Sequence, residues 1–233
     1  MTTRKTAVVT GASRGIGRAI AKRLASSHEI VAVARNREQL DSLAKEITDK
    51  GGKCRPLVLD VGNPEATEWA LGSVDADVLV NNAGIGVLRP MLQLSLDDWH
   101  RMVNVNFNAL FYVTRVLLPK MIRRGGGTIV NIGSLAGRNT FAGGTCYAAT
   151  KHAVVAFSES LMLEVRDSNV RVAMVMPGSV STHFGQHSGD MSWMLTSEDV
   201  AETVAFIIEQ RDGALVSRVE MRPAKPKRVE RQG

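Results

Sequence analysis

Residues 5–17 read KTAVVTGASRGIG, and this stretch decides the fold class. Its first half, KTAVVT, is a short apolar run typical of a buried strand. The second half spaces three glycines as Gly-x-x-x-Gly-x-Gly, at the start of a segment that predicts a helix from Gly15 to Ser27. Taken alone, such glycines also fit tight packing, but at the first strand-to-helix turn they favour phosphate binding. The N–H groups and the positive end of the helix would hold the anion.

Strand-like and helix-like segments alternate along the rest of the chain. Short apolar strands separated by amphipathic helices predict a parallel sheet with helices on both faces. Right-handed crossovers make such a sheet doubly wound. We therefore expect an α/β fold of Rossmann type, with about seven strands in a single domain over residues 1–233. After residues 5–10, the predicted strands cover residues 29–34, 54–60, 77–84, 128–134, 170–176 and 214–221; the further helices cover about 37–50, 96–123, 145–166 and 197–210.

Composition excludes several classes of protein. The chain has 233 residues, of which 44% are hydrophobic and 22% charged, as in ordinary globular domains. It lacks an apolar run long enough to span a membrane, and its first residues lack the pattern of a signal peptide. Cys54 and Cys146 are far apart and outside any metal-ligand spacing, which favours free thiols in a reducing compartment. We expect a cytoplasmic protein with no membrane partner.

The formal net charge of +6 is concentrated at one end of the chain. The last residues, RPAKPKRVERQG at 222–233, predict a flexible basic tail. Elsewhere there is no basic helix and no interleaving of aromatic and basic residues, so we expect no nucleic-acid partner. His183 and His187 have no third ligand beside them, so we expect no metal site.

Two arginines predict which dinucleotide binds. An NAD site usually has an acidic residue at the end of the second strand, where this chain has Ala34, Arg35 and Asn36. The guanidinium of Arg35 suits a 2′-phosphate, and Arg14 in the glycine turn can reach the same group. Exposed loop arginines are the alternative reading. The pattern favours NADP(H) over NAD(H).

A tyrosine, a lysine and a serine form the candidate catalytic set. Tyr147 and Lys151 are four residues apart in a predicted helix, so their side chains share one face. A lysine near a phenol favours the phenolate and brings its pKa toward neutrality. Ser134 follows the fifth predicted strand at its carboxyl end, where doubly wound sheets bind ligands. A Tyr-x-x-x-Lys pair alone is common, and a serine at a strand end is often a cap; here both occur together.

These motifs resemble the short-chain dehydrogenase/reductase family over nearly the whole chain. The resemblance rests on Thr10–Gly17, Asn81-Asn82-Ala83-Gly84, Asp60 after the third strand, Ser134 thirteen positions before Tyr147, and Pro177-Gly178 followed by Thr182. Together with the turn and the arginines, it implies a cofactor-binding set. This set comprises Gly11, Ser13, Arg14, Gly15, Ile16, Gly17, Arg35, Asp60, Val61, Asn82, Ala83, Gly84, Tyr147, Lys151, Pro177, Gly178, Val180 and Thr182.

The resemblance also implies a reaction, in which an NADP(H)-dependent oxidoreductase interconverts a secondary alcohol and a ketone. Tyr147 would exchange the proton on oxygen, Ser134 would polarise the carbonyl, and Lys151 would hold the nicotinamide ribose. Asn106, in a Val-Asn context of the long fourth helix, would hold a relay water against Lys151. Asn104 and Asn108 lie close by, which leaves that assignment open. The resemblance further implies a homotetramer or homodimer.

Departures from the family pattern bear on the substrate. The ending Arg218–Pro223 and residues 131–134 resemble the NADP-dependent 3-hydroxy acid (serine-type) dehydrogenases more than the 3-oxoacyl-carrier-protein reductases. A small hydroxy acid is therefore the first expectation and a 3-oxoacyl thioester the alternative. A protein that senses NADP(H) without turnover is the alternative from another class, although it would not need the Ser-Tyr-Lys set.

The predicted substrate lid spans residues 177–196. Its apolar members Phe184, Met191, Trp193 and Met194 are candidate walls of the site. Arg89 and Arg138 lie on loops that we expect to border the cleft. Either can pair with a substrate carboxylate, although surface arginines without a role are the more common case.

Overall fold

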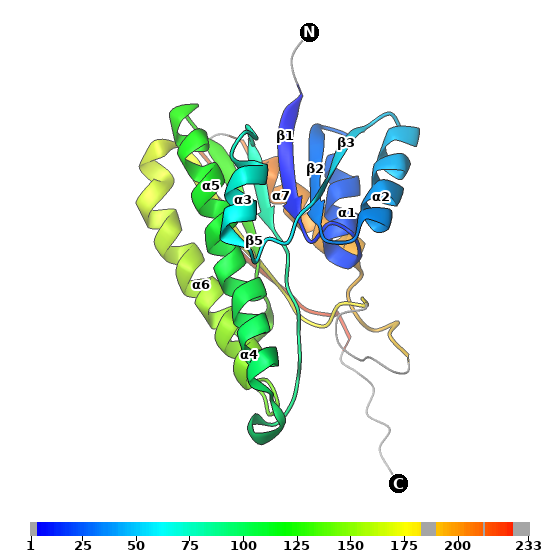
Figure 1. The fold of residues 1–233 in the computed structure, drawn as a ribbon, viewed down its shortest axis with the longest axis vertical. Helices are drawn as coiled ribbons and strands as arrows, with labels where there is room; N and C mark the ends of the chain where they lie inside the picture. Colours follow the sequence, from blue (N-terminus) through cyan, green and yellow to red (C-terminus); the bar gives the residue numbers. More distant parts are fainter. Residues whose placement is uncertain (1–3, 183–189, 212, 226–233) are drawn as a thin grey trace.

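Seven parallel strands form one sheet in the computed structural model, in the order β3-β2-β1-β4-β5-β6-β7 (Figure 1). The structure describes residues 4–182, 190–211 and 213–225. Val8 of β1 lies beside Val31 of β2 and Leu79 of β4, so β1 and β4 occupy the centre. The α/β, doubly wound prediction is confirmed. The strands are β1 (Lys5–Thr10), β2 (His28–Ala34), β3 (Lys53–Val58), β4 (Val78–Asn81), β5 (Gly127–Ile132), β6 (Val170–Pro177) and β7 (Arg218–Met221).

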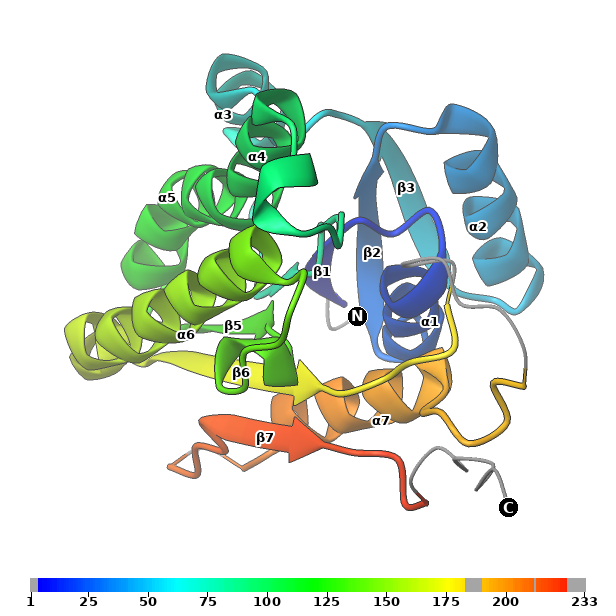
Figure 2. The same ribbon diagram turned by 90° about the horizontal axis from the view of Figure 1, so that it is seen from below.

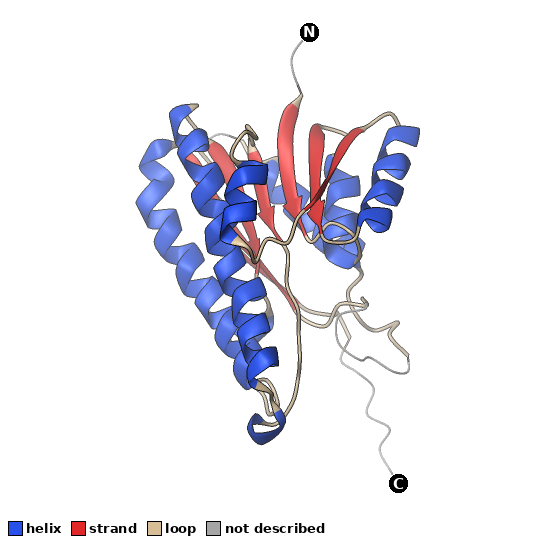
Figure 3. Ribbon diagram, viewed as in Figure 1, coloured by secondary structure: helices blue, strands red, loops and turns tan. Residues whose placement is uncertain are grey.

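Helices cover both faces of the sheet (Figures 2 and 3). One face carries α1 (Gly15–Leu24), α2 (Arg37–Asp49) and α7 (Ser197–Ile208). The other carries α3 (Pro64–Leu71), α5 (Ala109–Arg123) and α6 (Thr145–Val165), with α4 (Leu96–Val103) packed against α6. No helix among the described residues is both long and apolar enough to cross a membrane.

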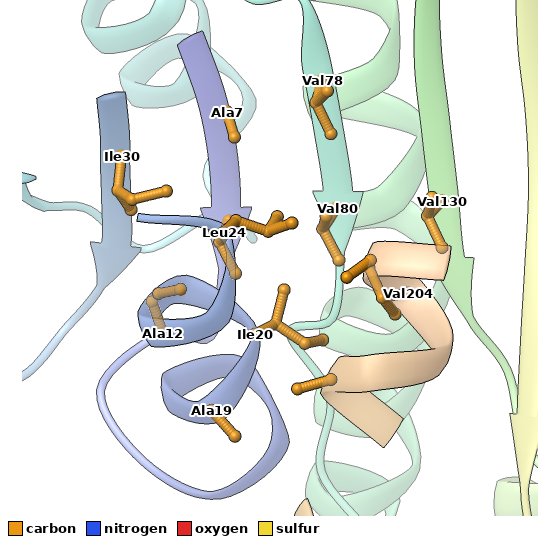
Figure 4. Close-up of a cluster of buried hydrophobic side chains, with 14 of the residues drawn as sticks. Ala7, Ala12, Ala19, Ile20, Leu24, Ile30, Val78, Val80, Val130 and Val204 are labelled. Carbon is orange, nitrogen blue, oxygen red and sulfur yellow. The ribbon is translucent and has the colours of Figure 1, made fainter. Parts of the chain in front are cut away.

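The side-chain alternation of each strand divides the apolar residues between two cores. Ala7 and Val9 of β1 pack with α1 and α7 (Figure 4), whereas Val8 packs with α3 and α5 on the opposite face. Ile20 and Leu24 of α1 are fully buried in the first of these cores. Because both faces are buried, the inner strands are mostly apolar, as the sequence indicated, whereas the edge strands β3 and β7 carry charged residues and are not fully buried.

Polar caps fix where several helices begin. The side chains of Asn36, Asn63, Ser95 and Thr196 each accept a hydrogen bond from a backbone N–H in the first turn of α2, α3, α4 and α7. The Asp199 carboxylate also accepts from the Thr196 backbone N–H, which completes a capping box. These caps set the helix starts where loops from the ligand edge of the sheet enter them.

The helix predicted over 96–123 begins and ends at the expected residues, whereas three other predicted boundaries were wrong by several residues. The expected helix over 96–123 is divided into α4 and α5 by a π-helical turn at Asn104–Asn108. Most residues from Met102 to Val113 are apolar, so the phase shift caused by one extra residue does not stand out in the sequence. The first helix ends at Leu24 instead of Ser27, and the fourth strand ends at Asn81 instead of Gly84. The last strand is confined to Arg218–Met221, because 214–217 approach it as a loop.

Candidate active site

A cleft of about 980 Å³ opens at the carboxyl ends of the central strands. It lies where the strand order reverses between β1 and β4, the usual ligand position of a doubly wound sheet. Only Gly17 and Asn106 of the predicted site residues do not line it. The predicted residues that do are Gly11, Ser13, Arg14, Gly15, Ile16, Arg35, Asp60, Val61, Asn82, Ala83, Gly84, Ser134, Tyr147, Lys151, Pro177, Gly178, Val180 and Thr182.

The glycine turn requires its glycines for two different reasons. Gly11 and Gly15 have φ values of +66° and +54°, a region that side chains disfavour. Gly17 lies behind the turn, where an added Cβ would come within 2.3 Å of the Gly11 carbonyl oxygen. Gly17 therefore allows the first turn of α1 to pack against the loop, while the N-terminus of α1 faces the cleft.

The side chain of Asn82 binds the backbone of this turn. Its side-chain amide donates to the carbonyl oxygens of Thr10 (3.0 Å) and Gly11 (3.3 Å). The Thr10 hydroxyl in turn accepts from the backbone N–H groups of Asn82 (3.0 Å) and Ala83 (3.1 Å). The end of β4 is thus fastened to the end of β1, which fixes the shape of the cleft floor.

Charged side chains mark the end of the cleft beside β2 and β3. Arg35 Nη1 lies 3.8 Å from Asp60 Oδ2, and both side chains are more than half exposed. Asp60 Oδ1 also accepts from the Gly62 backbone N–H at 3.0 Å. Arg14 is the N-cap residue of α1 and also lines the cleft. Arg35 and Asp60 therefore place one guanidinium and one carboxylate at this end.

Ser134, Tyr147 and Lys151 meet at the other end of the cleft. The Ser134 hydroxyl accepts from the Ala136 backbone N–H (3.1 Å) and forms a hydrogen bond with the Tyr147 phenol. Lys151 Nζ lies 5.9 Å from the centroid of the Tyr147 ring, one helical turn along α6. It donates to the Ile132 carbonyl oxygen at 3.0 Å, which directs the ammonium to the end of β5. The predicted triad is assembled in space.

Burial dominates the ionisation of this cluster. It lowers the pKa of Lys151 to about 8, because the surrounding protein disfavours the charged ammonium. It raises the pKa of Tyr147, while the hydrogen bond with Ser134 acts in the opposite direction. Desolvation therefore raises the pKa of the Tyr147 phenol, opposite to the lowering that the sequence led us to expect from Lys151.

Asn106 lies behind the cleft wall, in the π-helical turn. Its side chain is buried, with 3% of the residue exposed. Asn106 Nδ2 donates to the Ile85 carbonyl oxygen (2.9 Å) and to Thr150 Oγ1 (3.1 Å). Asn106 Oδ1 accepts a hydrogen bond from the Ile85 backbone N–H (2.8 Å). Asn104 instead donates to Gly62, and Asn108 to Asn104. Of the three asparagines, Asn106 is the one bound to α6 next to Lys151.

Glycine at position 84 leaves space between Asn106 and Lys151. A Cβ added at Gly84 would lie 3.5 Å from Asn106 Oδ1 and 3.9 Å from Lys151 Nζ. Both polar atoms therefore border one small volume at the cleft wall. The second lone pair of Oδ1 is available to a hydrogen-bond donor placed there.

The remaining wall is formed by the described part of the predicted lid and by the C-terminal segment. Trp193 lines the cleft, whereas Met191 and Met194 do not; Phe184, His183 and His187 lie outside the described residues. Residues 222–225, expected within a flexible tail, also line it. Arg89 and Arg138 are not lining residues: the Arg89 N–H donates to the Gly143 carbonyl at 2.9 Å, and Arg138 pairs with Glu220.

Sequence reasoning missed several lining side chains. Gln39 lies in the first turn of α2, directly after Arg35, and that position was a signal that it faces the same edge. Asn139 and Phe141 follow Ser134 in a loop without a periodic pattern, so nothing indicated their direction. Within residues 4–182, 190–211 and 213–225, no group of three or more His, Cys, Asp or Glu residues is placed to hold a metal ion.

Known proteins share both the sequence and this arrangement. A family model described as short chain dehydrogenase matches residues 5–193. The NADP-dependent 3-hydroxy acid dehydrogenase YdfG of Salmonella typhi is 37% identical over 93% of this chain and 94% of its own length. The alcohol dehydrogenase of the archaeon Thermococcus sibiricus complexed with 5-hydroxy-NADP has a TM-score of 0.89 at 30% identity, covering 97% of this chain and all of its own. A closed serine dehydrogenase complexed with NADP+ has a TM-score of 0.86 at 34% identity, with the same coverage. The chain belongs to the short-chain dehydrogenase family.

Proposed function

We propose that this chain is an NADP(H)-dependent oxidoreductase that interconverts a secondary alcohol and a ketone, with small 3-hydroxy acids as its first substrate class. One observation carries the proposal. The hydrogen-bonded Ser134–Tyr147 pair and the buried Lys151 ammonium lie in the same cleft as a glycine turn suited to a diphosphate. The relatives named above, including enzymes described as NADP-dependent or bound to NADP, support it.

The cleft suits a dinucleotide of this kind. The turn at Gly11–Gly17 presents backbone N–H groups and a helix N-terminus to a diphosphate. Arg14 and Arg35 supply two guanidinium groups at the end where a 2′-phosphate would lie, with Gln39 beside them. Asp60 and Val61 border the same end and would face the adenine. The volume of about 980 Å³ leaves room for a small second ligand.

Bound NADP(H) supplies or accepts the hydride at the nicotinamide. Ser134 Oγ, already held by the Ala136 N–H, is placed to donate a hydrogen bond to the substrate oxygen. The Tyr147 phenol, adjacent to Ser134, gives the proton to that oxygen in ketone reduction and takes it in alcohol oxidation. A negative charge on the phenol is stabilised by the nearby Lys151 ammonium. Holding these groups in one orientation contributes much of the rate.

Lys151 and Asn106 would replenish the proton. A water in the space beside Gly84 would lie within hydrogen-bonding reach of Lys151 Nζ and of the remaining lone pair of Asn106 Oδ1. The bonds of Asn106 to Ile85 and Thr150 fix the orientation of that oxygen. Asn106 is therefore a positioning residue for the relay, and its π-helical turn places it.

Nicotinamide absorbance with Tyr147→Phe tests the assignment. The substrate panel comprises 3-hydroxy acids, serine, an acetoacetyl thioester and neutral ketones, each with NADP(H) and NAD(H). We expect turnover with NADP(H), abolished in Tyr147→Phe with NADPH binding retained. Tyr112→Phe, on α5 and outside the cleft lining, is the matched control and should keep full activity. Wild-type turnover in Tyr147→Phe would exclude Tyr147 as the acid.

The same panel separates the alternatives. Exclusive use of the acetoacetyl thioester would identify a 3-oxoacyl reductase. Tight NADPH binding without turnover on any substrate would identify a sensing protein of this fold. A small-molecule carbonyl or alcohol is the only class of partner that the proposal requires, and neither nucleic acid nor membrane enters it.

We further propose a homotetramer or homodimer in the cytoplasm. Phe111 and Ile122 of α5 and Leu163 of α6 are exposed apolar side chains on the outer helices of one face. Cys54 and Cys146 are free thiols, as suits a reducing compartment. Sizing by light scattering over a range of protein concentrations tests the assembly, and a monomer mass throughout would exclude it.

A further inference from the structure

The segment after β7 forms part of the cleft wall close to Ser134. The Gly178 backbone N–H donates to the Met221 carbonyl oxygen at 2.8 Å. A Cβ added at Gly178 would lie 3.1 Å from Leu135 Cδ1 and 3.6 Å from Pro223 Cδ. Leu135 directly follows Ser134, so residues 221–223 lie at the catalytic end of the cleft.

Glu220 connects this segment to the loop after β5. Its Oε1 pairs with Arg138, and its Oε2 pairs with Arg222 Nη1 at 3.1 Å. The Glu220 side chain is only 20% exposed, whereas both arginines are more than half exposed. Of the two, Arg222 lines the cleft and Arg138 does not. Glu220 therefore holds Arg222 from one side, and the guanidinium keeps further N–H donors that can bind a ligand.

Basic side chains outnumber acidic ones where the C-terminal segment lines the cleft. Asp60 is the one carboxylate among the described lining residues, and it lies at the opposite end beside Arg35. Arg222 and Lys225 line the C-terminal wall without a lining carboxylate near them. Glu220 is shared by Arg138 and Arg222 and therefore balances only one of these two positive charges. An anionic group on the substrate would complement the charge that remains.

We propose that Arg222 binds the carboxylate of the substrate and selects acids over neutral alcohols and ketones. This assignment rests on the proposed oxidoreductase function. The planar guanidinium can donate two parallel hydrogen bonds to a carboxylate, and such charge-assisted pairs are among the stronger hydrogen bonds. Glu220 acts as a positioning residue that restricts the arginine before the substrate arrives. Arg138 anchors Glu220 to the loop that carries Ser134.

The test compares an acid with its uncharged ester in matched variants. Oxidation of 3-hydroxybutanoate and methyl 3-hydroxybutanoate is measured in wild type, Arg222→Gln, Arg222→Lys and Arg218→Gln. In Arg222→Gln we expect kcat/KM for the acid to fall about 10- to 100-fold, mainly through KM, and that for the ester to change by less than about threefold. Arg222→Lys should restore part of the loss.

The controls distinguish the possible failures. Arg218→Gln removes the same charge from β7, where Arg218 pairs with Glu159 outside the cleft lining, and should leave the ratio of acid to ester unchanged. An equal loss in both arginine variants, or an unchanged ratio in Arg222→Gln, would overturn the assignment. A raised KM for NADP+ in Arg222→Gln would reassign the residue to the cofactor. Absence of turnover with the acid, the ester and a neutral ketone would instead refute the proposed function itself.

Discussion

The ammonium of Lys151 lies 3.0 Å from the carbonyl oxygen of Ile132, and the two residues are only 6% and 7% exposed. One hydrogen bond to a neutral acceptor replaces only part of the hydration that a charged ammonium has in water. The pKa of Lys151 is accordingly lowered to about 8. The position of this lysine thus serves the site at the expense of stability, as is common for catalytic groups.

Lys151→Met should stabilise the protein and inactivate it. A pKa of about 8 against the ordinary value near 10.4 corresponds to roughly 3 kcal/mol of unfavourable burial at pH 7. Loss of the bond to Ile132 offsets about 1–2 kcal/mol of this. We expect a net gain of about 1–2 kcal/mol in the free energy of unfolding, measured by denaturant titration at pH 7 without cofactor.

The free energy of unfolding should change with pH in a direction set by the lowered pKa of Lys151. Between pH 8 and about 10.4 the unfolded lysine is protonated and the folded lysine is not, so the wild type gains stability as the pH rises. Below pH 8 both states are protonated and the full penalty is present. The advantage of Lys151→Met should therefore be constant below pH 8 and shrink toward pH 10. A difference independent of pH would mean that Lys151 is not the titrating group.

Gly84→Ala should impair proton transfer without disturbing the fold. The added methyl would make ordinary contacts of 3.5 Å with Asn106 Oδ1 and 3.9 Å with Lys151 Nζ, filling the space assigned to the relay water. We expect kcat to fall about 10- to 100-fold, the range of a lost acid-base contribution. Gly133→Ala, whose methyl would meet only the flexible Met174 and Met176, is the control.

Asn82→Asp should loosen the glycine turn. The carboxylate has nearly the shape of the amide but cannot donate to the carbonyl oxygens of Thr10 and Gly11, and it repels them. We expect the Kd for NADPH to rise at least about tenfold and the unfolding free energy to fall by about 1–3 kcal/mol. Fluorescence titration with NADPH and thermal unfolding measure the two effects. Wild-type affinity would show that the turn keeps its shape without Asn82.

The sequence was sufficient to predict those parts of the site in which a local pattern and a chemical requirement coincide. The turn at Gly11–Gly17 combines a positional signal with backbone geometry that only glycine adopts easily, and the structure has both. Tyr147 and Lys151 share a helical face, so their proximity follows from spacing alone.

The missed features depend on contacts between distant segments. The π-helical turn at Asn104–Asn108 breaks no apolar pattern, yet it orients Asn106 toward Ile85 and Thr150. Arg222 belongs to a stretch of basic composition that predicts a tail, and contacts with Gly178 and Glu220 place this segment at the cleft. Composition describes a segment in isolation, whereas these roles arise from tertiary contacts.

Arg35→Asp should reverse the preference for the phosphorylated cofactor. Arg35 is 68% exposed and lies 3.8 Å from Asp60, so it is held loosely enough to turn toward a 2′-phosphate. An aspartate there would repel that phosphate and accept hydrogen bonds from the ribose hydroxyls of NADH. We expect the ratio of kcat/KM for NADPH to that for NADH to fall at least about 100-fold. Arg37→Asp makes the same change of charge two residues further on, outside the cleft lining, and should alter the ratio little. Equal effects of the two variants would attribute the preference to the overall field of the domain, and an unchanged ratio in Arg35→Asp would leave Arg14 as the residue that selects the phosphate.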